Sequence, residues 1–259
     1  MSKLKNYINY VKYRTQIIFN KLGWHVSKYK PLANEVNPAV VVSNVLGKTE
    51  GFVIIDGGAW IGNESVKYND VFKSSQIFAF EPFPKSYAKL VENTSQYSNI
   101  FPQKLALSDE NKMLEFHSNL NETTNSLMSS VLGTDRKDYL RKTADIIEVV
   151  ATTLDSFCDE KNIDHIDFLK MDLQGGEMLA LKGCVKLLEK EKISVIYSEI
   201  WFEEQYKNAP MYNHIASFLE DYGFVTYKMF GLNEGDDGHL MWGDVMYVHK
   251  NHIQKRLKH

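Results

Sequence analysis

A short stretch of the chain combines an acid with a glycine-rich turn in a way that suits ligand binding. The apolar run 52–56 predicts a buried strand that ends in Asp56, and Gly57, Gly58 and Gly62 follow at the edge of a helical pattern. Glycines let the backbone turn sharply and approach a ligand closely, and a helix N-terminus offers free N–H groups. Because open α/β sheets bind ligands beyond the carboxyl ends of their strands, the turn predicts a nucleotide-like ligand. A purely structural role, in which Gly58 and Gly62 permit tight strand–helix packing, stays open.

A second acid follows at the corresponding place of the next strand. The run 76–81 ends in Glu81, twenty-five residues after Asp56. A carboxylate at that position can accept hydrogen bonds from both hydroxyls of a ribose. The alternative for Glu81 is a solvated loop carboxylate.

The type of turn separates two kinds of nucleotide ligand. Neither the dinucleotide fingerprint G-x-G-x-x-G nor a G-x-x-x-x-G-K-[ST] phosphate loop occurs, and the turn is D-G-G-x-x-x-G. An acid at the strand end repels a pyrophosphate but suits the ammonium of a methionine moiety, directly or through water. Asp109, after the third strand, either accepts from the amine of an adenine or forms a turn. The pattern therefore favours S-adenosylmethionine over a dinucleotide.

Short apolar runs and helical patterns alternate around this turn, which is typical of a parallel sheet covered on both faces. The predicted strands are 52–56, 76–81, one within 100–108, 166–172, 193–200, 224–230 and 244–250. The predicted helices are 63–73, 84–97, 153–162, 176–190 with an interruption near Gly183, and 211–222. The fold class that follows is α/β: a Rossmann-like, doubly wound, mostly parallel seven-stranded sheet that ends in an antiparallel hairpin.

Regions outside this alternation suggest the domain organisation. Helical patterns at 4–22 and 37–47, the second opened by Asn37-Pro38, predict an N-terminal helical extension over residues 1–50. The main domain is expected at 51–250. It carries an insertion at about 110–150, where strand patterns at 112–118 and 146–153 flank a polar stretch. Residues 251–259 form a basic tail.

Five segments together resemble one family, the FkbM-type methyltransferases, over roughly residues 50–250. They are DGGAWIGNES, FEPFP, LALSD, TTLDSF and IDFLKMDLQGGEMLALKG. The resemblance implies S-adenosylmethionine as cofactor and methyl transfer to oxygen, typically a hydroxyl of a sugar, glycan or secondary metabolite. Gly57, Trp60 and Gln174 depart from the residues expected at their positions, and at 174 an acid is common. The cofactor-binding residues expected are Asp56, Gly57, Gly58, Ala59, Gly62, Asn63, Glu81, Pro82, Ser108, Asp109 and Asp172.

An alcohol is a poor nucleophile, so a base that removes its proton is expected near the methyl donor. The candidates are Asp172 and Glu199, at the ends of the fourth and fifth parallel strands, and His239 in the loop 231–243. Asp172 is the first choice because a carboxylate at the end of a buried strand is costly without a purpose, although it could also be a helix N-cap. Glu177 is expected to satisfy backbone N–H groups at a helix start or to pair with a loop cation. No metal site is predicted, because the spacing of Asp236, Asp237 and His239 is too loose.

The composition of the chain excludes some classes of partner and indicates a cellular compartment. The net charge of −3 and the lack of a base-flipping motif argue against nucleic acid, which leaves a small-molecule or glycan acceptor. Two cysteines without a signal peptide predict reduced thiols in a cytoplasmic protein. Residues 1–30 are basic and free of acids, so this segment either caps the domain or contacts an anionic membrane, a carrier protein or another subunit. A homo-oligomer is compatible with the sequence.

Two other classes of function stay open. A nucleotide-cofactor oxidoreductase would share the sheet but lacks its fingerprint here. A non-catalytic family member, serving as a binding or assembly module, would be consistent with Gln174 but has no need of the intact turn and Glu81.

Overall fold

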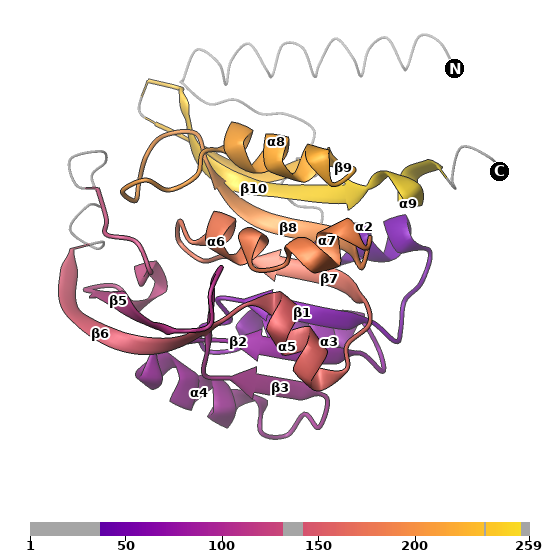
Figure 1. The fold of residues 1–259 in the computed structure, drawn as a ribbon, viewed down its shortest axis with the longest axis horizontal. Coiled ribbons are helices and arrows are strands. Elements are labelled where there is room, and N and C mark those ends of the chain that lie inside the picture. Colours follow the sequence, from indigo (N-terminus) through magenta and orange to yellow (C-terminus); the bar gives the residue numbers. More distant parts are fainter. Residues whose placement is uncertain (1–36, 132–141, 236, 255–259) are drawn as a thin grey trace, which may run out of the picture. The chain divides into compact units, whose positions relative to one another are not determined.

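The computed structural model describes residues 37–131, 142–235 and 237–254, and its centre is a seven-stranded sheet of order β3-β2-β1-β7-β8-β10-β9 (Figure 1). The five strands from β3 to β8 pair in parallel, and β10 pairs antiparallel with both β8 and β9. The predicted mostly parallel sheet with a terminal antiparallel hairpin is therefore confirmed. Its strands are β1 (Val53–Gly57), β2 (Gln76–Phe80), β3 (Ile100–Gln103), β7 (Ile166–Met171), β8 (Ile193–Trp201), β9 (Phe224–Glu234) and β10 (Leu240–His249).

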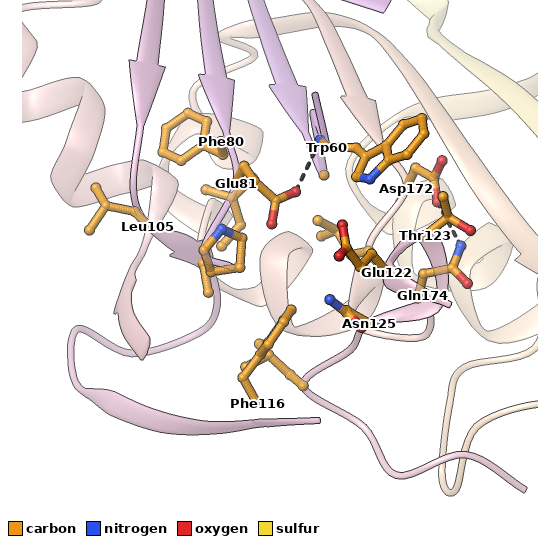
Figure 2. Close-up of a pocket in the computed structure, with 16 residues that line it drawn as sticks. Trp60, Phe80, Glu81, Leu105, Phe116, Glu122, Thr123, Asn125, Asp172 and Gln174 are labelled. Carbon is orange, nitrogen blue, oxygen red and sulfur yellow. Dashed lines mark hydrogen bonds between the residues drawn. The ribbon is translucent and has the colours of Figure 1, made fainter. Parts of the chain in front are cut away.

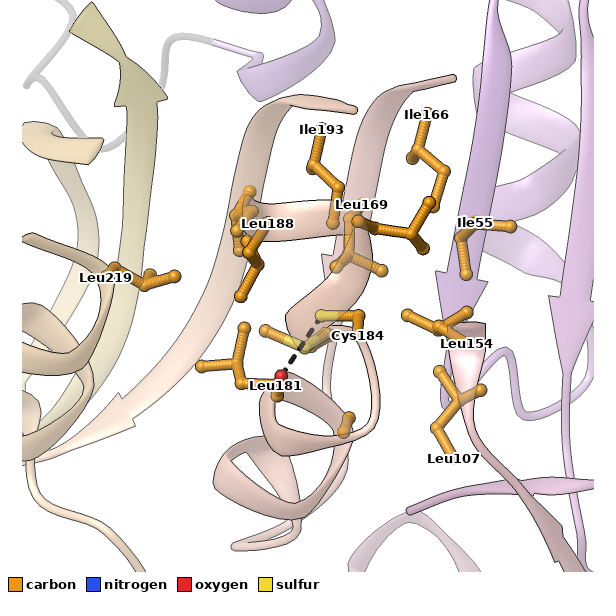
Figure 3. Packing of buried hydrophobic residues seen from close by; sticks show 14 of the residues in the cluster. Ile55, Leu107, Leu154, Ile166, Leu169, Leu181, Cys184, Leu188, Ile193 and Leu219 are labelled. Carbon is orange, nitrogen blue, oxygen red and sulfur yellow. Dashed lines mark hydrogen bonds between the residues drawn. The ribbon is translucent and has the colours of Figure 1, made fainter. Parts of the chain in front are cut away.

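Helices cover both faces of this sheet because successive strand residues point to opposite faces and are apolar on both. On one face Ile55, Leu169 and Ile196 pack against the helices that follow the later strands (Figure 3). On the other face Ile54 and Phe168 pack against the N-terminal helices. The first group is α5 (Leu154–Lys161), α6 (Glu177–Lys182), α7 (Val185–Glu189) and α8 (Tyr212–Asp221), and the second is α2 (Pro38–Leu46), α3 (Asn63–Val71) and α4 (Pro84–Thr94).

Helix α2 begins as the sequence predicts. The Asn37 side chain accepts a hydrogen bond from the Ala39 N–H at 2.9 Å, and Pro38 occupies the first helical turn. Val42 of α2 is fully buried in the same core cluster as Ile54 of β1, so α2 packs against the sheet. The predicted helix 4–22 and residues 255–259 of the basic tail lie outside the described residues, and the predicted domain boundaries stay predictions.

A smaller sheet lies beside the main one. Strands β4 (Ala106–Leu107), β5 (Met113–Asn119) and β6 (Thr143–Thr152) form it in the order β4-β6-β5, with a 3₁₀ turn, η2 (Glu122–Thr124), after β5. The expected single strand within 100–108 is thus two strands, because the chain leaves β2 after Gln103 and pairs next with β6. The interruption expected near Gly183 separates α6 from α7. A short helix, α9 (Lys250–Gln254), follows β10 where no helix was predicted.

Candidate active site

Asp56, the acid at the end of β1, lies inside the protein and not on a cavity surface. It is fully buried, accepts a hydrogen bond from the Ser65 hydroxyl at 2.6 Å, and lies 3.1 Å from the Lys170 ammonium. Its negative charge is therefore matched by Lys170. The sequence predicts that Asp56 interacts with the ammonium of a ligand. In the structure Asp56 lines neither of the two cavities described below.

Lys170 joins β7 to the turn after β1. Its Nζ donates to the carbonyl oxygens of Gly57 and Gly58 at 3.3 and 3.1 Å, and lies 3.9 Å from the Asp172 carboxylate. Burial by itself would lower the pKa of Lys170, but the carboxylates of Asp56 and Asp172 outweigh burial and raise it. Lys170 is therefore a permanent cation whose donors are already engaged.

The turn glycines have packing roles that the sequence left open. Gly58 has φ +72°, and a Cβ there would lie 1.9 Å from the carbonyl oxygen of Asp172. Gly62 has φ +89°, and a Cβ there would meet the side chains of Leu90 and Thr94 in α4 at 2.8 and 3.0 Å. Both glycines are thus required by the protein's own packing, while Gly58 also lines a cavity.

Glu81, after β2, is held by backbone donors. Its carboxylate accepts hydrogen bonds from the Trp60 N–H at 3.0 Å and the Phe83 N–H at 2.8 Å. Only 7% of the residue is exposed, so it is not a solvated loop carboxylate. Burial raises the pKa of Glu81 to about 7, against the lowering effect of these two N–H groups.

Glu81 lies on a cavity at the carboxyl ends of β1, β2 and β7, which we call the first cavity (Figure 2). Its empty volume is about 820 Å³, which includes space open to solvent. Trp60 and Glu81 face the segment that follows β5, including Asn125, across the cavity. The complete lining is Gly58, Trp60, Phe80, Glu81, Pro82, Leu105, Ala106, Leu107, Phe116, Glu122, Thr123, Asn125, Leu127, Asp172, Leu173 and Gln174.

Two hydrogen-bond donors of this lining lack partners. The Trp60 Nε1 and the Asn125 Nδ2 are buried and donate to no group in the described part of the chain. A buried donor without a partner costs free energy, and a ligand acceptor removes that cost. The cavity therefore suits a ligand that brings hydrogen-bond acceptors to its two sides.

Most of the remaining residues expected to bind a cofactor lie outside the lining of the first cavity. Ala59 is buried and Asn63 is exposed at the start of α3, and neither lines the first cavity. The Ser108 hydroxyl donates to the half-buried Asp109 carboxylate at 3.1 Å, and neither residue is in the lining. Pro82 is in the lining.

A polar network connects the ends of β7 and β8. The Gln174 Nε2 donates to Asp172 at 2.8 Å and to Glu199 at 2.7 Å, and its Oε1 accepts from the Tyr206 hydroxyl at 2.6 Å. Burial, and then the charge of Asp172, raise the pKa of Glu199 well above its ordinary value. Glu199 is buried, whereas Asp172, whose side chain is 46% exposed, is the carboxylate that faces solvent.

Glu177 has the structural role that the sequence predicts for it. Its carboxylate accepts a hydrogen bond from the Leu173 N–H at 2.8 Å, across the loop that precedes α6. The N-cap of α6 is Gly176 and not Asp172, so the N-cap alternative for Asp172 does not hold. Glu177 is fully buried and lines neither cavity.

Asp172 also lines a second cavity, on the side of α2 and α3. The second cavity has an empty volume of about 690 Å³, again including open solvent. Its lining is Asn37, Pro38, Glu64, Tyr68, Lys170, Met171, Asp172, Tyr197 and Asp244. Asp172 is the residue that the two linings share.

His239 lies away from both cavities. Its ring contacts the carboxylates of Asp237 and Glu203, which raise its pKa, and it lines neither cavity. Its predicted catalytic role stays a prediction. Over the ranges 37–131, 142–235 and 237–254, no group of three or more His, Cys, Asp or Glu side chains is placed to hold a metal ion. None of the described helices is long and apolar enough to cross a membrane.

Several residues of the two linings were not singled out by the sequence. The sequence contains a signal that could have identified Lys170, since a lysine inside the apolar run IDFLKMD must find a buried partner. Glu122 and Asn125 lie in a polar stretch whose return to the first cavity depends on the β5–β6 pairing. Tyr68 and Tyr197 are common core residues in sequence terms, and only the structure places them on a cavity.

Comparison with known proteins assigns the chain to a family. The family described as the Methyltransferase FkbM domain matches residues 56–226, which is more than half of the chain. One relative is 28% identical over 191 residues, covering 71% of this chain and 77% of its own length: the 2-O-methyltransferase NoeI of Sinorhizobium fredii.

Solved structures of similar fold are distant. Magnesium protoporphyrin IX methyltransferase from Synechocystis PCC 6803, solved with bound SAM, has a TM-score of 0.45 at 11% identity, with 86% of each chain covered. A putative rRNA-methylase from Clostridium thermocellum has a TM-score of 0.46 at 9% identity, with 86% of this chain and 99% of that chain covered. Scores this low carry no conclusion about function. The family match does: the chain belongs to the FkbM methyltransferase family and is an enzyme whose methyl donor is S-adenosylmethionine.

Proposed function

We propose that this enzyme methylates a hydroxyl group of a small molecule or glycan, such as a sugar or a secondary metabolite. The observation that carries the proposal is the position of Asp172, which lines both cavities and whose side chain is 46% exposed. An alcohol needs a proton acceptor at the point where donor and acceptor meet. The name of the relative NoeI, a 2-O-methyltransferase, supports oxygen as the methyl acceptor.

The first cavity is the proposed donor site. When bound, S-adenosylmethionine supplies a methyl group whose bond to sulfur breaks, with its electron pair left on sulfur, as a carbon–oxygen bond forms. Glu81 accepts hydrogen bonds from the ribose hydroxyls while the Trp60 and Phe83 N–H groups hold its carboxylate. The unpartnered donors of Trp60 and Asn125 bind acceptor atoms of the same ligand. Asp56 acts indirectly, since its charge fixes Lys170 and thereby the turn that contains Gly58.

Asp172 is the proposed base. It accepts the proton of the acceptor hydroxyl, and the Gln174 amide holds its Oδ1 through a 2.8 Å hydrogen bond. The buried Glu199 accepts a hydrogen bond from the same amide and holds Gln174 from its other side. The glutamine at 174 fits this role, because an acid there would add a third carboxylate between Asp172 and Glu199.

The test uses S-adenosylmethionine labelled with ¹³C in its methyl group and a panel of hydroxyl-bearing sugars and metabolites. The carbon chemical shift of each product shows whether the methyl group is bonded to oxygen, nitrogen or carbon. We expect methoxy products, with Asp172→Asn lowering kcat by about 100-fold or more, in the range for loss of a general base. S-adenosylhomocysteine affinity should change little in this variant. The control Asp221→Asn, an exposed carboxylate on α8, should retain full activity. Products methylated on nitrogen or carbon would contradict the proposal.

The other predicted partners and the cytoplasmic location remain proposals. A small-molecule or glycan acceptor is the partner that this function requires. The contact of residues 1–30 with a membrane or another subunit falls on residues outside the described part of the chain.

A further inference from the structure

The second cavity contains several groups that the donor site does not use. It lies where α2 and α3 meet the carboxyl end of β7 and the middle of β8, and Asp244 of β10 completes it. It shares one lining residue, Asp172, with the first cavity. A molecule in the second cavity would therefore lie beside the proposed base and next to the donor.

The charges of this lining are mainly negative. Glu64, Asp172 and Asp244 contribute carboxylates, and Lys170 is the single cationic residue of the lining. The Lys170 ammonium is already occupied by Asp56 and by two carbonyl oxygens. Outside the cavity, the Lys67 ammonium lies 2.6 Å from the Glu64 carboxylate and offsets part of its charge. A bound phosphate or carboxylate would thus face like charges without a free cation, which is unfavourable.

One hydroxyl of the lining makes no hydrogen bond to the described part of the chain. Tyr68 is 5% exposed, and its hydroxyl makes no hydrogen bond within residues 37–131, 142–235 and 237–254. The ring is fixed by an edge contact with Phe168, with the ring centroids 5.4 Å apart. The Tyr197 hydroxyl, in contrast, is hydrogen-bonded to the Asp244 carboxylate. A hydroxyl without a hydrogen-bond partner on a cavity lining is a polar group that a ligand can satisfy.

We infer that the second cavity binds the methyl acceptor, and that this acceptor is a hydroxyl-rich molecule without negative charge, such as a neutral sugar or an amino sugar. The carboxylates of Asp172 and Asp244 accept hydrogen bonds from its hydroxyl or ammonium groups. The Tyr68 hydroxyl bonds a further polar atom, and the tyrosine rings pack against the apolar faces of a sugar ring. The inference rests on the proposed function and adds the chemical class and location of the acceptor.

Binding to the cavity can be measured separately from methyl transfer. A 3-fluorotyrosine at position 68 of the full-length chain, saturated with S-adenosylhomocysteine, gives a ¹⁹F signal that reports on the second cavity. The probes share one ring and differ in charge: glucose, glucosamine and glucose 6-phosphate. We expect glucose and glucosamine to shift the signal, and glucose 6-phosphate to bind at least about tenfold more weakly than glucose. Asp244→Asn should narrow that difference, because it removes a carboxylate from the lining.

A label on a second tyrosine tests whether the probes act at the second cavity and not on any fluorinated tyrosine ring. The same label at Tyr87, a half-buried tyrosine of α4 outside both cavities, should not respond to any of the probes. Binding of glucose 6-phosphate as tight as that of glucose would overturn the charge argument, and silence of the Tyr68 label with all three probes would overturn the location. Either result leaves O-methylation standing if methoxy products form in the transfer assay. Nitrogen or carbon products there would instead count against the proposed function alone.

Discussion

Glu81 and Glu177 are two buried glutamates with similar electrostatics and different surroundings. Burial raises the pKa of each to about 7, and backbone N–H groups oppose that rise in both. Glu81 lies on the first cavity, whereas Glu177 is enclosed beneath the loop that precedes α6. A shifted pKa therefore does not by itself distinguish a ligand-binding carboxylate from a structural one, and the position of the cavity does.

The largest effect on stability is expected from Glu177→Ala. The variant leaves the Leu173 N–H without its acceptor and opens a void, which should lower the free energy of unfolding by about 2–4 kcal/mol. Denaturant unfolding measures this value. The control Glu92→Ala, on the exposed face of α4, should change it by less than about 0.5 kcal/mol. Equal losses in the two variants would remove the structural role given to Glu177.

The pH dependence of stability sharpens the comparison. A carboxyl group whose pKa rises on folding, here from 4.5 to about 7, binds protons more tightly in the folded state. Its contribution is thus complete below pH 4.5 and is lost as the pH rises to about 7. Asp244, whose pKa burial raises to about 6, acts in the same direction.

Glu177→Gln isolates one of these contributions, because the amide stays neutral at every pH and its oxygen can accept from Leu173. We expect the free energy of unfolding to fall less between pH 5 and pH 8 in this variant than in the wild type. Chemical denaturation at the two pH values tests this expectation. If the free energy of unfolding falls equally in the variant and the wild type between the two pH values, Glu177 does not titrate in this range.

A smaller effect is expected at Asn125, on the opposite wall of the first cavity from Glu81. Asn125→Asp keeps the acceptor for the Asn119 N–H, which donates at 2.7 Å, and removes the unpartnered Nδ2 donor. S-adenosylhomocysteine should bind roughly 3- to 10-fold more weakly, the worth of one hydrogen bond. Asn233→Asp, on β9 and outside both cavities, is the matched control. Unchanged affinity would mean that the segment after β5 does not contact the donor.

The main sheet was predictable because each parallel strand is a short apolar run bounded by turn residues, and the end of each run sets the place of Asp56, Glu81 and Asp172. The split of 100–108 into two strands and the return of Asn125 to the first cavity were not, since both depend on pairing between segments distant in sequence. Local sequence likewise does not show that Lys170 neutralises Asp56, which requires β1 and β7 to be neighbours.

The donor site at Glu81 is tested most directly by a calorimetric titration of S-adenosylhomocysteine into the wild type and into Glu81→Ala. We expect one site per chain and a loss of about 1–3 kcal/mol of binding free energy in the variant, because the ribose hydroxyls lose the Glu81 carboxyl group as their acceptor. Because Glu81→Ala also leaves the Trp60 and Phe83 N–H groups without their acceptor, denaturant unfolding checks that the variant is folded under the conditions of the titration. Equal affinity of the wild type and the folded variant would contradict the placement of the donor at Glu81.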